Sequence, residues 1–521
     1  MNKYKILGLW MLLVFMSACS EDFLDIAPED KITVDNYYNS DDQLLTGGAA
    51  LYNRPWFAFN EKFILCLDVY AGNASGDYVD IAQFNKFAVF AANQFSTEGY
   101  QSLFSVVAYA NNLLDIVENR AGQNISEEVK EWSRGEGLFM RSVAYYFLVR
   151  TFGPVPILED IDQYGTDAVV YKNRVEDIYT LIERDLKEAA ELLPMAWSET
   201  NAGRATKGAA NGMLAEMYLT LGDYANAKLY ADKVIESGKY SLMPNYYDNF
   251  QPKNGVSSDN NKESIFELQW VSPPQGEHWY YTNTHQAYLA AAGKLTGTGD
   301  GWATFIPCND FIAAYEEGDL RRHPTIMEKG NFYPELVTKE GGYLVENSLT
   351  ANYAGFRKYV VGSAEEWPSV NFMNTDVNTH ILRYAEILLI RAEAILGTAS
   401  STTDATALAD INAVRERAGL EALTEITLDD ILHERRMELV IESGDRWFDL
   451  ARINRNKAID ILSNTDRAYL ADREDLRWGH KEEEDLLYRR KVISYCPFRR
   501  WKLISILCFW KRLLLMNSIN N

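Results

Sequence analysis

The sequence predicts a mostly α-helical protein in which a scaffold of helix pairs is interrupted by one long loop-rich segment. Two observations lead to this prediction. Apolar residues recur every three or four positions between about residues 126 and 240, and again between about residues 381 and 456, which is typical of amphipathic helices. Residues from about 241 to 380 lack this spacing and are rich in Gly, Asn and aromatic side chains. We therefore expect this segment to form a second lobe that packs against the scaffold.

Residues 1–18 have the pattern of a lipoprotein signal peptide. Two lysines give a positive start, and the uncharged run at residues 6–15 is too short to cross a bilayer. Two small residues then precede Cys19, and acidic residues follow it. The pattern predicts cleavage before Cys19 and lipidation of this cysteine. Several acyl chains would anchor the mature protein to a membrane durably, whereas one chain would not.

The composition limits the partners and cofactors. The chain has 521 residues, of which 47% are hydrophobic, so it can bury a large core. Its net charge of -23 would repel a phosphate backbone, and we expect no nucleic-acid partner. The five cysteines include no CxxC pair and no zinc-type cluster. We therefore expect no cofactor; structural Ca²⁺ is an option that nothing in the sequence supports.

The first expected helix pair lies in residues 126–194. Ser126 is a suitable N-cap, and the first helix should end at Gly153, where the sequence GPVP follows. The partner helix has apolar residues spaced by three or four and stops at Pro194.

Residues 209–235 match the tetratricopeptide pattern. Small and aromatic residues, among them Ala215, Tyr218 and Gly222, occupy the offsets at which two antiparallel helices approach around a tight turn. A looser form of this arrangement pairs residues 383–396 with 405–420, and another pair starts at residue 428. Four tetratricopeptide-type helix pairs are therefore expected.

The last pair contains an arginine that needs a partner. Thr427 and Asp430 fit a capping box, and Arg436 shares a helical stripe with Leu432 and Leu439. An unpaired charge on a buried stripe costs several kcal/mol, so a carboxylate should face Arg436. We favour a structural ion-pair network over a catalytic acid–base pair. The nearby acids are Glu434, Glu438, Glu442 and Asp449.

Seven stretches in one order make the chain recognisable. They are CSEDFLDIAPED, GEGLFMRSVAYYFLVRTFGPVPI, RATKGAANGMLAEMYLTLGDYANA, ESIFELQW, LRYAEILLIRAEAI, INAVRERAGL and ERRMELVIESGDRWFDLAR. Together they run from Cys19 to about Arg452, and over this length the chain resembles the SusD/RagB family of outer-membrane lipoproteins from glycan-foraging Bacteroidetes.

The resemblance implies a fold, a location and a function. It implies a SusD-like domain over residues 19–492, lipid-anchored at the outer membrane and facing the cell surface, with Glu21 and Asp22 resembling a surface-export signal. It also implies capture of oligosaccharide or polysaccharide, and delivery to a SusC-type TonB-dependent transporter that the scaffold covers as a lid. No enzyme activity is expected.

Sugar capture requires exposed aromatic faces with polar groups beside them. In the loop-rich segment, GEHWYYTNTH supplies Trp279, Tyr280, Tyr281 and Asn283. An early loop, AGNASGDYVD, and the GTGDGWATFIP stretch supply further candidates, for which core packing is the alternative; for Trp302 a similar Gly-Trp element in the family favours packing. These candidates are Asn73, Asp77, Tyr78 and Trp302.

Two other functions stay open. A helical-repeat adaptor that binds a protein would use the same scaffold without the aromatic candidates. A glycoside hydrolase needs only two carboxylates, which spacing cannot exclude among 74 acids. The sequence has no HExxH, GxSxG or phosphate-binding glycine loop. Release of new reducing ends from glycans would identify a hydrolase.

Residues 493–521 depart from the family pattern. They contain five Lys or Arg and no acid, in a chain that is otherwise strongly acidic. A membrane-surface amphipathic helix is one interpretation. We favour a slipped reading frame just before this tail, which resequencing around Val492 would test.

Overall fold

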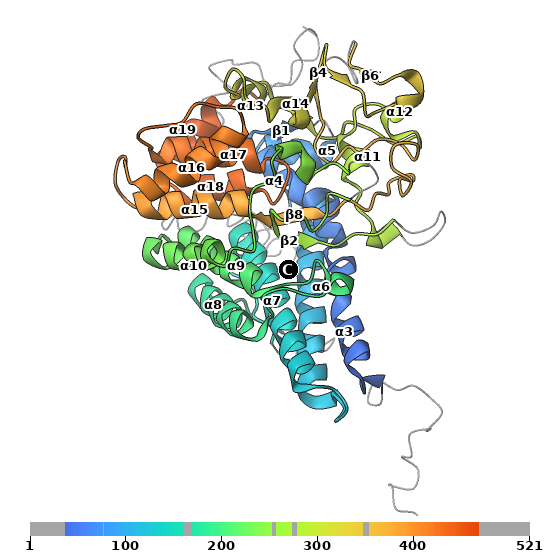
Figure 1. The fold of residues 1–521 in the computed structure, drawn as a ribbon, viewed down its shortest axis with the longest axis vertical. Helices are drawn as coiled ribbons and strands as arrows, with labels where there is room; N and C mark the ends of the chain where they lie inside the picture. Colours follow the sequence, from blue (N-terminus) through green and yellow to red (C-terminus); the bar gives the residue numbers. More distant parts are fainter. Residues whose placement is uncertain are drawn as a thin grey trace, which may run out of the picture.

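The computed structural model describes residues 37–76, 78–159, 169–252, 257–272, 279–346 and 354–467. The predicted signal peptide, Cys19, Asp77 and the basic tail lie outside these ranges, as does the side chain of Trp279. Helices predominate and strands are short, which confirms the mostly α-helical prediction (Figure 1). Among the helices of these ranges, none combines the length and the apolar character needed to cross a bilayer.

The four predicted helix pairs are present and stack beside one another (Figure 1). Helix α8 packs against α9, and α10 packs against α15, so the two halves of the scaffold join although the loop-rich segment separates them in sequence. A further helix, α19 (Arg455–Asn464), follows the fourth pair. The pairs are α7 (Glu127–Phe152) with α8 (Val175–Leu192), α9 (Lys207–Leu221) with α10 (Tyr224–Glu236), α15 (Tyr384–Leu396) with α16 (Ala405–Arg417), and α17 (Leu428–Leu439) with α18 (Asp445–Arg452).

Local signals set the ends of these helices. The Ser126 side chain accepts from the backbone N–H of Val129, which satisfies a free donor of the first turn of α7. Thr427 and Asp430 form both hydrogen bonds of a capping box at the start of α17. Gly222 ends α9 with φ +73°, a left-handed conformation that glycine adopts without steric cost.

An N-terminal group of helices precedes the first pair, where the sequence analysis defined no element. Helix α6 is the longest of this group and packs along α7. The early AGNASGDYVD loop contributes the short strand β1 (Ala74–Ser75) and the start of α5. The helical elements are α3 (Asp41–Ala49), η2 (Arg54–Trp56), η3 (Phe59–Phe63), α4 (Ile64–Ala71), α5 (Val79–Asn85), α6 (Gln94–Asp115) and η4 (Ile116–Arg120).

The segment between the scaffold halves is loop-rich, with short helices and antiparallel strand pairs. The strand pairs are β1 with β3 (Ile306–Pro307), β2 (Ser264–Leu268) with β8 (Thr379–Arg383), β4 (Ile326–Glu328) with β7 (Ala354–Phe356), and β5 (Phe332–Tyr333) with β6 (Tyr343–Leu344). The short helices are η7 (Tyr246–Asn249), η8 (Trp279–Tyr281), α11 (His285–Leu289), α12 (Gly293–Thr296), α13 (Asn309–Ala313), α14 (Arg322–Thr325) and η9 (Thr338–Glu340), while η6 (Glu199–Asn201) lies between α8 and α9.

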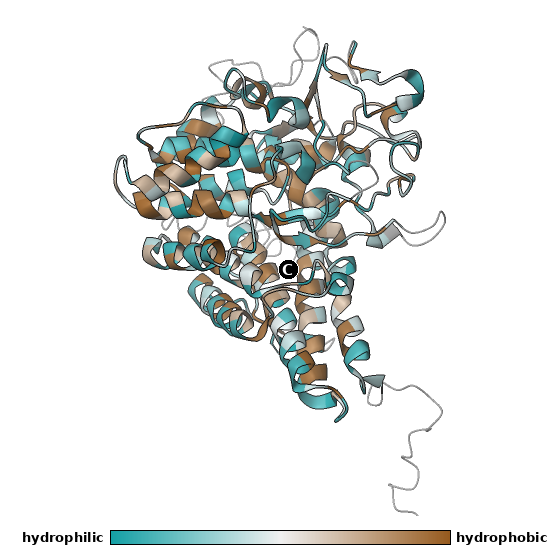
Figure 2. Ribbon diagram, viewed as in Figure 1, coloured by the Kyte–Doolittle hydropathy of each residue, from teal (hydrophilic) through white to brown (hydrophobic). Residues whose placement is uncertain are grey.

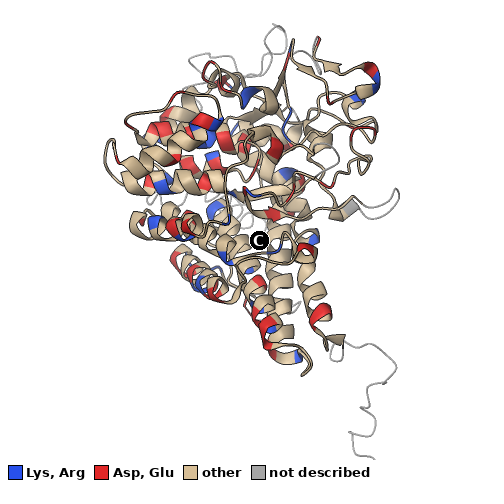
Figure 3. Cartoon of the chain, in the orientation of Figure 1, with Lys and Arg blue, Asp and Glu red and all other residues tan. Residues whose placement is uncertain are grey.

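Apolar residues fill the interior, and charged residues are interleaved along the scaffold helices (Figures 2 and 3). Some charges are fully buried. Arg383 has no exposed surface, and its guanidinium contacts Glu263 beside β2, Glu438 at 2.9 Å on α17, and Glu442 at 2.7 Å. The loop-rich lobe and the scaffold are therefore joined by a buried ionic cluster as well as by apolar packing.

The ion-pair network expected around Arg436 is present, but its partner differs from the acids considered in the sequence. The Arg436 guanidinium contacts Asp310 at 2.9 Å. Within the described part of the chain, it forms no ion pair with the four acids near it in sequence. Those acids pair with other cations: Glu434 with Arg321 and Arg415, Glu438 with Arg321, Arg383 and Arg417, Glu442 with Arg383 and Lys358, and Asp449 with Arg435 and Arg452.

Candidate functional site

Trp302 follows Gly301 in a loop that is hydrogen-bonded to α11. Gly301 has φ +92°, and a Cβ atom there would lie 2.8 Å from the carbonyl oxygen of Ala292, so glycine is required. The backbone N–H of Trp302 donates to the carbonyl of Ala287 at 2.9 Å. The indole remains 41% exposed.

Phe372 lies beside this indole at the tip of a tight turn. Asn371 and Asn374 exchange two backbone hydrogen bonds of 3.0 Å, and the buried Asp300 carboxylate accepts from the backbone N–H of Met373. The Phe372 ring is 52% exposed, and its centroid is 6.0 Å from that of Trp302. Asp300 therefore holds the Phe372 turn against the loop that carries Trp302.

Tyr78 extends the same group of rings. It directly precedes α5, is 49% exposed, and stacks on the buried Phe95 of α6 with a centroid distance of 5.6 Å and an interplanar angle of 5°. The Lys62 ammonium is 4.9 Å from the Phe95 centroid and 5.5 Å from that of Tyr288. Tyr288 in turn packs against Trp302 at 5.4 Å. We call the three exposed rings of Tyr78, Trp302 and Phe372 the aromatic strip.

The charges behind the strip are compensated. The Tyr288 hydroxyl donates to Glu61 at 2.7 Å, and the Lys62 ammonium lies 3.1 Å from the same carboxylate. Burial, reinforced by the Glu61 charge, raises the pKa of Tyr288, so its hydroxyl stays protonated as a donor. The strip is therefore a neutral aromatic surface on a fixed support.

Tyr280 and Tyr281 form a separate aromatic pair. Tyr280 is 44% exposed and packs edge-on against Phe57 with a centroid distance of 5.4 Å. Tyr281 is half-buried, and the guanidinium of Arg54 lies 6.0 Å from its ring centroid. Both tyrosines belong to the short helix η8, which begins at Trp279. The structure thus links Tyr78 to Trp302 through Phe95, Lys62 and Tyr288, whereas Tyr280 and Tyr281 make other contacts.

Two of the amide candidates are buried. The Asn73 side chain donates to Asp68 at 2.8 Å and accepts from Arg436 at 2.8 Å. The Asn283 side chain donates to the carbonyl of Val377 at 2.7 Å and accepts from the backbone of His285. Both side chains stabilise loops, so we leave them out of the surface proposed to contact ligand.

The sequence analysis missed Phe372 and the rings that support the strip. Phe372 lies in the sequence NFMN, where turn-forming residues flank an aromatic residue, and this signal could have identified it. No local signal distinguishes Phe95, Tyr288 or Lys62 from ordinary core and helix residues, because their role depends on contacts between distant segments.

One acidic group of the described residues has metal-compatible spacing. The carboxylates of Glu216, Glu386 and Asp445 lie within 4.8 Å of one another and are buried. The Arg435 guanidinium lies 3.1 Å from Glu386 and 3.8 Å from Glu216, so a cation already faces them. Burial raises the pKa of Asp445 to about 7, so the average negative charge of the three carboxyl groups near neutral pH is smaller than three. We assign this group to the structural ion-pair network.

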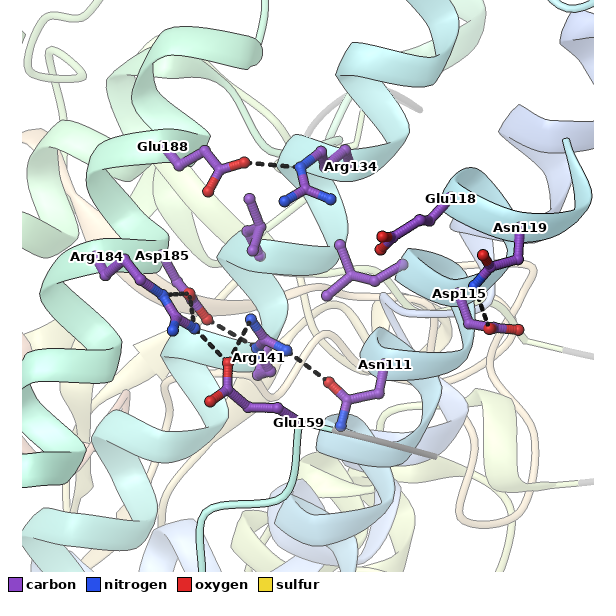
Figure 4. Close-up of a pocket in the computed structure, with 12 residues that line it drawn as sticks. Asn111, Asp115, Glu118, Asn119, Arg134, Arg141, Glu159, Arg184, Asp185 and Glu188 are labelled. Atoms are coloured by element: carbon purple, nitrogen blue, oxygen red, sulfur yellow. Dashed lines mark hydrogen bonds and ion pairs between the residues drawn. The ribbon is translucent and has the colours of Figure 1, made fainter. Parts of the chain in front are cut away.

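A cavity of about 570 Å³ lies on the scaffold, between α6 with η4, α7 and α8 (Figure 4). None of the residues proposed from the sequence for sugar contact lines it. We call it the scaffold groove.

Comparison with known proteins agrees with the fold. Residues 262–486 match the family model described as the SusD family, and residues 22–219 match one described as starch-binding associating with outer membrane. A SusD-like protein of Bacteroides ovatus is 35% identical over 90% of this chain and 86% of its own length. SusD-like protein P2 of Formosa agariphila is 25% identical over 87% of this chain and 91% of its own.

Solved structures give the same result. A crystal structure with xylogluco-oligosaccharide has a TM-score of 0.75 and 31% identity, covering 87% of this chain and 96% of that one. A laminarin-binding SusD-like protein has a TM-score of 0.68 at 24% identity, covering 84% and 95%, and supports the fold alone. These matches define an outer-membrane-associated class of carbohydrate-binding proteins that are not enzymes. The chain belongs to the SusD/RagB family.

Proposed function

We propose that this protein is a cell-surface lipoprotein that captures oligosaccharide on the aromatic strip and passes it to a SusC-type TonB-dependent transporter. The observation that carries the sugar-binding proposal is the exposure of Tyr78, Trp302 and Phe372 on supporting rings that are themselves packed. A pyranose ring presents C–H groups on one face, which pack against such aromatic surfaces.

The second aromatic pair extends this proposal. Tyr280 is exposed, and the neighbouring Tyr281 has the Arg54 guanidinium 6.0 Å from its ring centroid, so the two residues offer a ring edge near a charged donor. We assign it a supporting contact for longer oligosaccharides, together with Trp279 and Asp77, which remain predictions from the sequence.

The location and the transporter partner rest on the family and on the N-terminal pattern. Acylation of Cys19 would tether the domain to the outer membrane with its surface outward.

Isothermal titration calorimetry with xylogluco-oligosaccharides and laminarin oligosaccharides tests the sugar site. We expect Trp302→Ala and Tyr78→Ala each to weaken binding by about five- to tenfold, because each substitution removes a stacking contact of about 1–1.4 kcal/mol. Tyr171→Ala is the matched control, since Tyr171 is 82% exposed on the scaffold side and belongs to neither aromatic group. All three variants should still melt in one cooperative transition, which shows that they are folded.

The same experiment separates the alternatives. Binding that survives both strip substitutions would contradict the proposed site. A protein-binding adaptor predicts no affinity for any glycan in the panel, and a hydrolase predicts new reducing ends after incubation with the intact polysaccharide.

A further inference from the structure

Glu98 lies beside the two rings that support the aromatic strip. It is one turn beyond Phe95 on α6, so these two side chains are neighbours on the helix surface. Burial chiefly raises the pKa of Tyr288, and the charges of Glu61 and Glu98 raise it further. Glu98 must be close to the Tyr288 hydroxyl for its charge to act in this way. The carboxylate of Glu98 is therefore near both supporting rings.

The charge of Glu98 is not neutralised by a cation of the described residues. Its carboxylate accepts from the uncharged side-chain amide of Gln94 at 2.7 Å, and it forms no ion pair within the ranges that the structure describes. The ammonium of Lys62 lies beside the same supporting rings, but it is 3.1 Å from the Glu61 carboxylate and is already balanced by it. The charge that remains at this part of the strip is negative.

Two further carboxylates add to this negative charge. Asp80 lies two residues after Tyr78, in the first turn of α5. Asp300 lies two residues before Trp302, and it accepts from the Thr298 hydroxyl and from a backbone N–H. Both carboxylates are buried, and neither forms an ion pair with any described residue. Because solvent screens buried charges weakly, their field reaches the surface above them.

This field distinguishes neutral sugars from anionic ones. A neutral pyranose packs on an aromatic ring through its C–H face, and the field affects it little. A uronic acid or a sulfated sugar would bring another negative charge next to carboxylates that have no counter-ion. The net charge of -23 adds repulsion at longer range. The surroundings of the strip therefore favour uncharged glycans.

We propose that the aromatic strip selects neutral glycans over glycans that carry uronic acid or sulfate groups, and that Glu98 is a specificity-determining residue for this choice. The inference rests on the proposed function, because it concerns the sugar that the strip would hold. Glu98 is partly exposed, whereas the carboxylates of Glu61, Asp80 and Asp300 are buried. A sugar on the strip would therefore face the charge of Glu98 most directly.

Calorimetric titration of the full chain with matched tetrasaccharides tests this selection. The probes are cellotetraose and laminaritetraose, each as the neutral sugar, as a derivative in which a primary alcohol is oxidised to a carboxylate, and as the methyl ester of that derivative. The ester keeps the added carbonyl and removes the charge. The probes are short because the Arg54 guanidinium beside Tyr281 would attract a carboxylate on a longer chain. At low salt we expect the ester to bind about fivefold more tightly than the carboxylate, and this ratio to fall at high salt.

One substitution and a matched control locate the effect. Glu98→Gln should lower the affinity ratio of ester to carboxylate by about twofold, because a carboxylate beside the strip loses its charge. Glu118→Gln removes an equal charge at the scaffold groove and should leave the ratio unchanged (Figure 4). Phe95 is about 30 Å from the C-terminal end of α6, which rises about 1.5 Å per residue, and Glu118 lies beyond that end.

Each result has a separate meaning. Equal affinity for the ester and the carboxylate, or tighter binding of the carboxylate, would overturn the proposed selection. An unchanged ratio in Glu98→Gln would overturn the role assigned to Glu98. If neither the neutral sugars nor their derivatives bind, the proposed sugar site itself fails, and the selection falls with it.

Discussion

Trp302 and Tyr78 are the side chains on which the proposed function chiefly depends, and their surroundings explain why. Each packs against another aromatic ring of the protein, and each keeps about two-fifths to one-half of its surface in solvent. A ring held in this way loses little conformational freedom when a ligand packs on it, so less of the binding energy is lost to ordering. Asn73 and Asn283 have the right chemistry for sugar contact, but their side chains are buried and already hydrogen-bonded.

At the same scale, His285 makes stability depend on pH. Its Nε2 donates to the carbonyl of Asn60 at 2.7 Å, because a carbonyl can only accept, and burial lowers the pKa of His285 to about 4. The unfolded chain binds this proton near pH 6.5, so stability should fall as the pH falls from 6.5 to 4, by about 3 kcal/mol from this residue. Urea denaturation at several pH values should show a smaller acid loss in His285→Gln.

An exposed histidine provides the comparison. His323→Gln should keep the pH profile of the unaltered protein, because His323 lies at the surface. If His285→Gln lost stability toward pH 4 as steeply as His323→Gln, the neutral buried imidazole would be ruled out as the cause.

At the scale of elements, the cap of α17 has a measurable effect. Thr427→Ala removes the side-chain oxygen that accepts from the backbone N–H of Asp430, and should lower the free energy of unfolding by about 1 kcal/mol. Thr180→Ala is the control, because Thr180 is exposed within α8, where alanine favours the helix. A loss in Thr180→Ala equal to that in Thr427→Ala would contradict a specific capping effect.

Local signals explain which elements could be predicted from the sequence. The scaffold pairs have a helical period, caps and stop residues within each segment, and all four were predicted. Helix α6 was missed although Leu103, Val106 and Ala110 repeat at three and four, so the information was present. Strands of two to five residues are too short for an alternating pattern. The aromatic strip joins residues 78, 302 and 372, and only the folded chain brings them together.

At the scale of the whole molecule, buried charges link the two lobes. Arg383→Met removes a cation that faces Glu263, Glu438 and Glu442, and leaves these carboxylates without it in the interior. We expect a loss of about 3–5 kcal/mol in the free energy of unfolding, measured by urea denaturation. Lys228→Met breaks an exposed pair with Asp232 and should cost less than about 1 kcal/mol. Similar losses in the two variants would show that burial of the Arg383 cluster does not matter.

The ionic cluster around Arg383 also constrains how the two lobes could move relative to one another. Separating the lobe from the scaffold would break the ion pairs of the buried Arg383 guanidinium with Glu438 and Glu442. A hinge motion between the two lobes would therefore cost several kcal/mol. We therefore expect the two lobes to move as one rigid piece. In the delivery proposed above, any gating would then have its pivot at the junction with the transporter, and the two ends of α6 would move together.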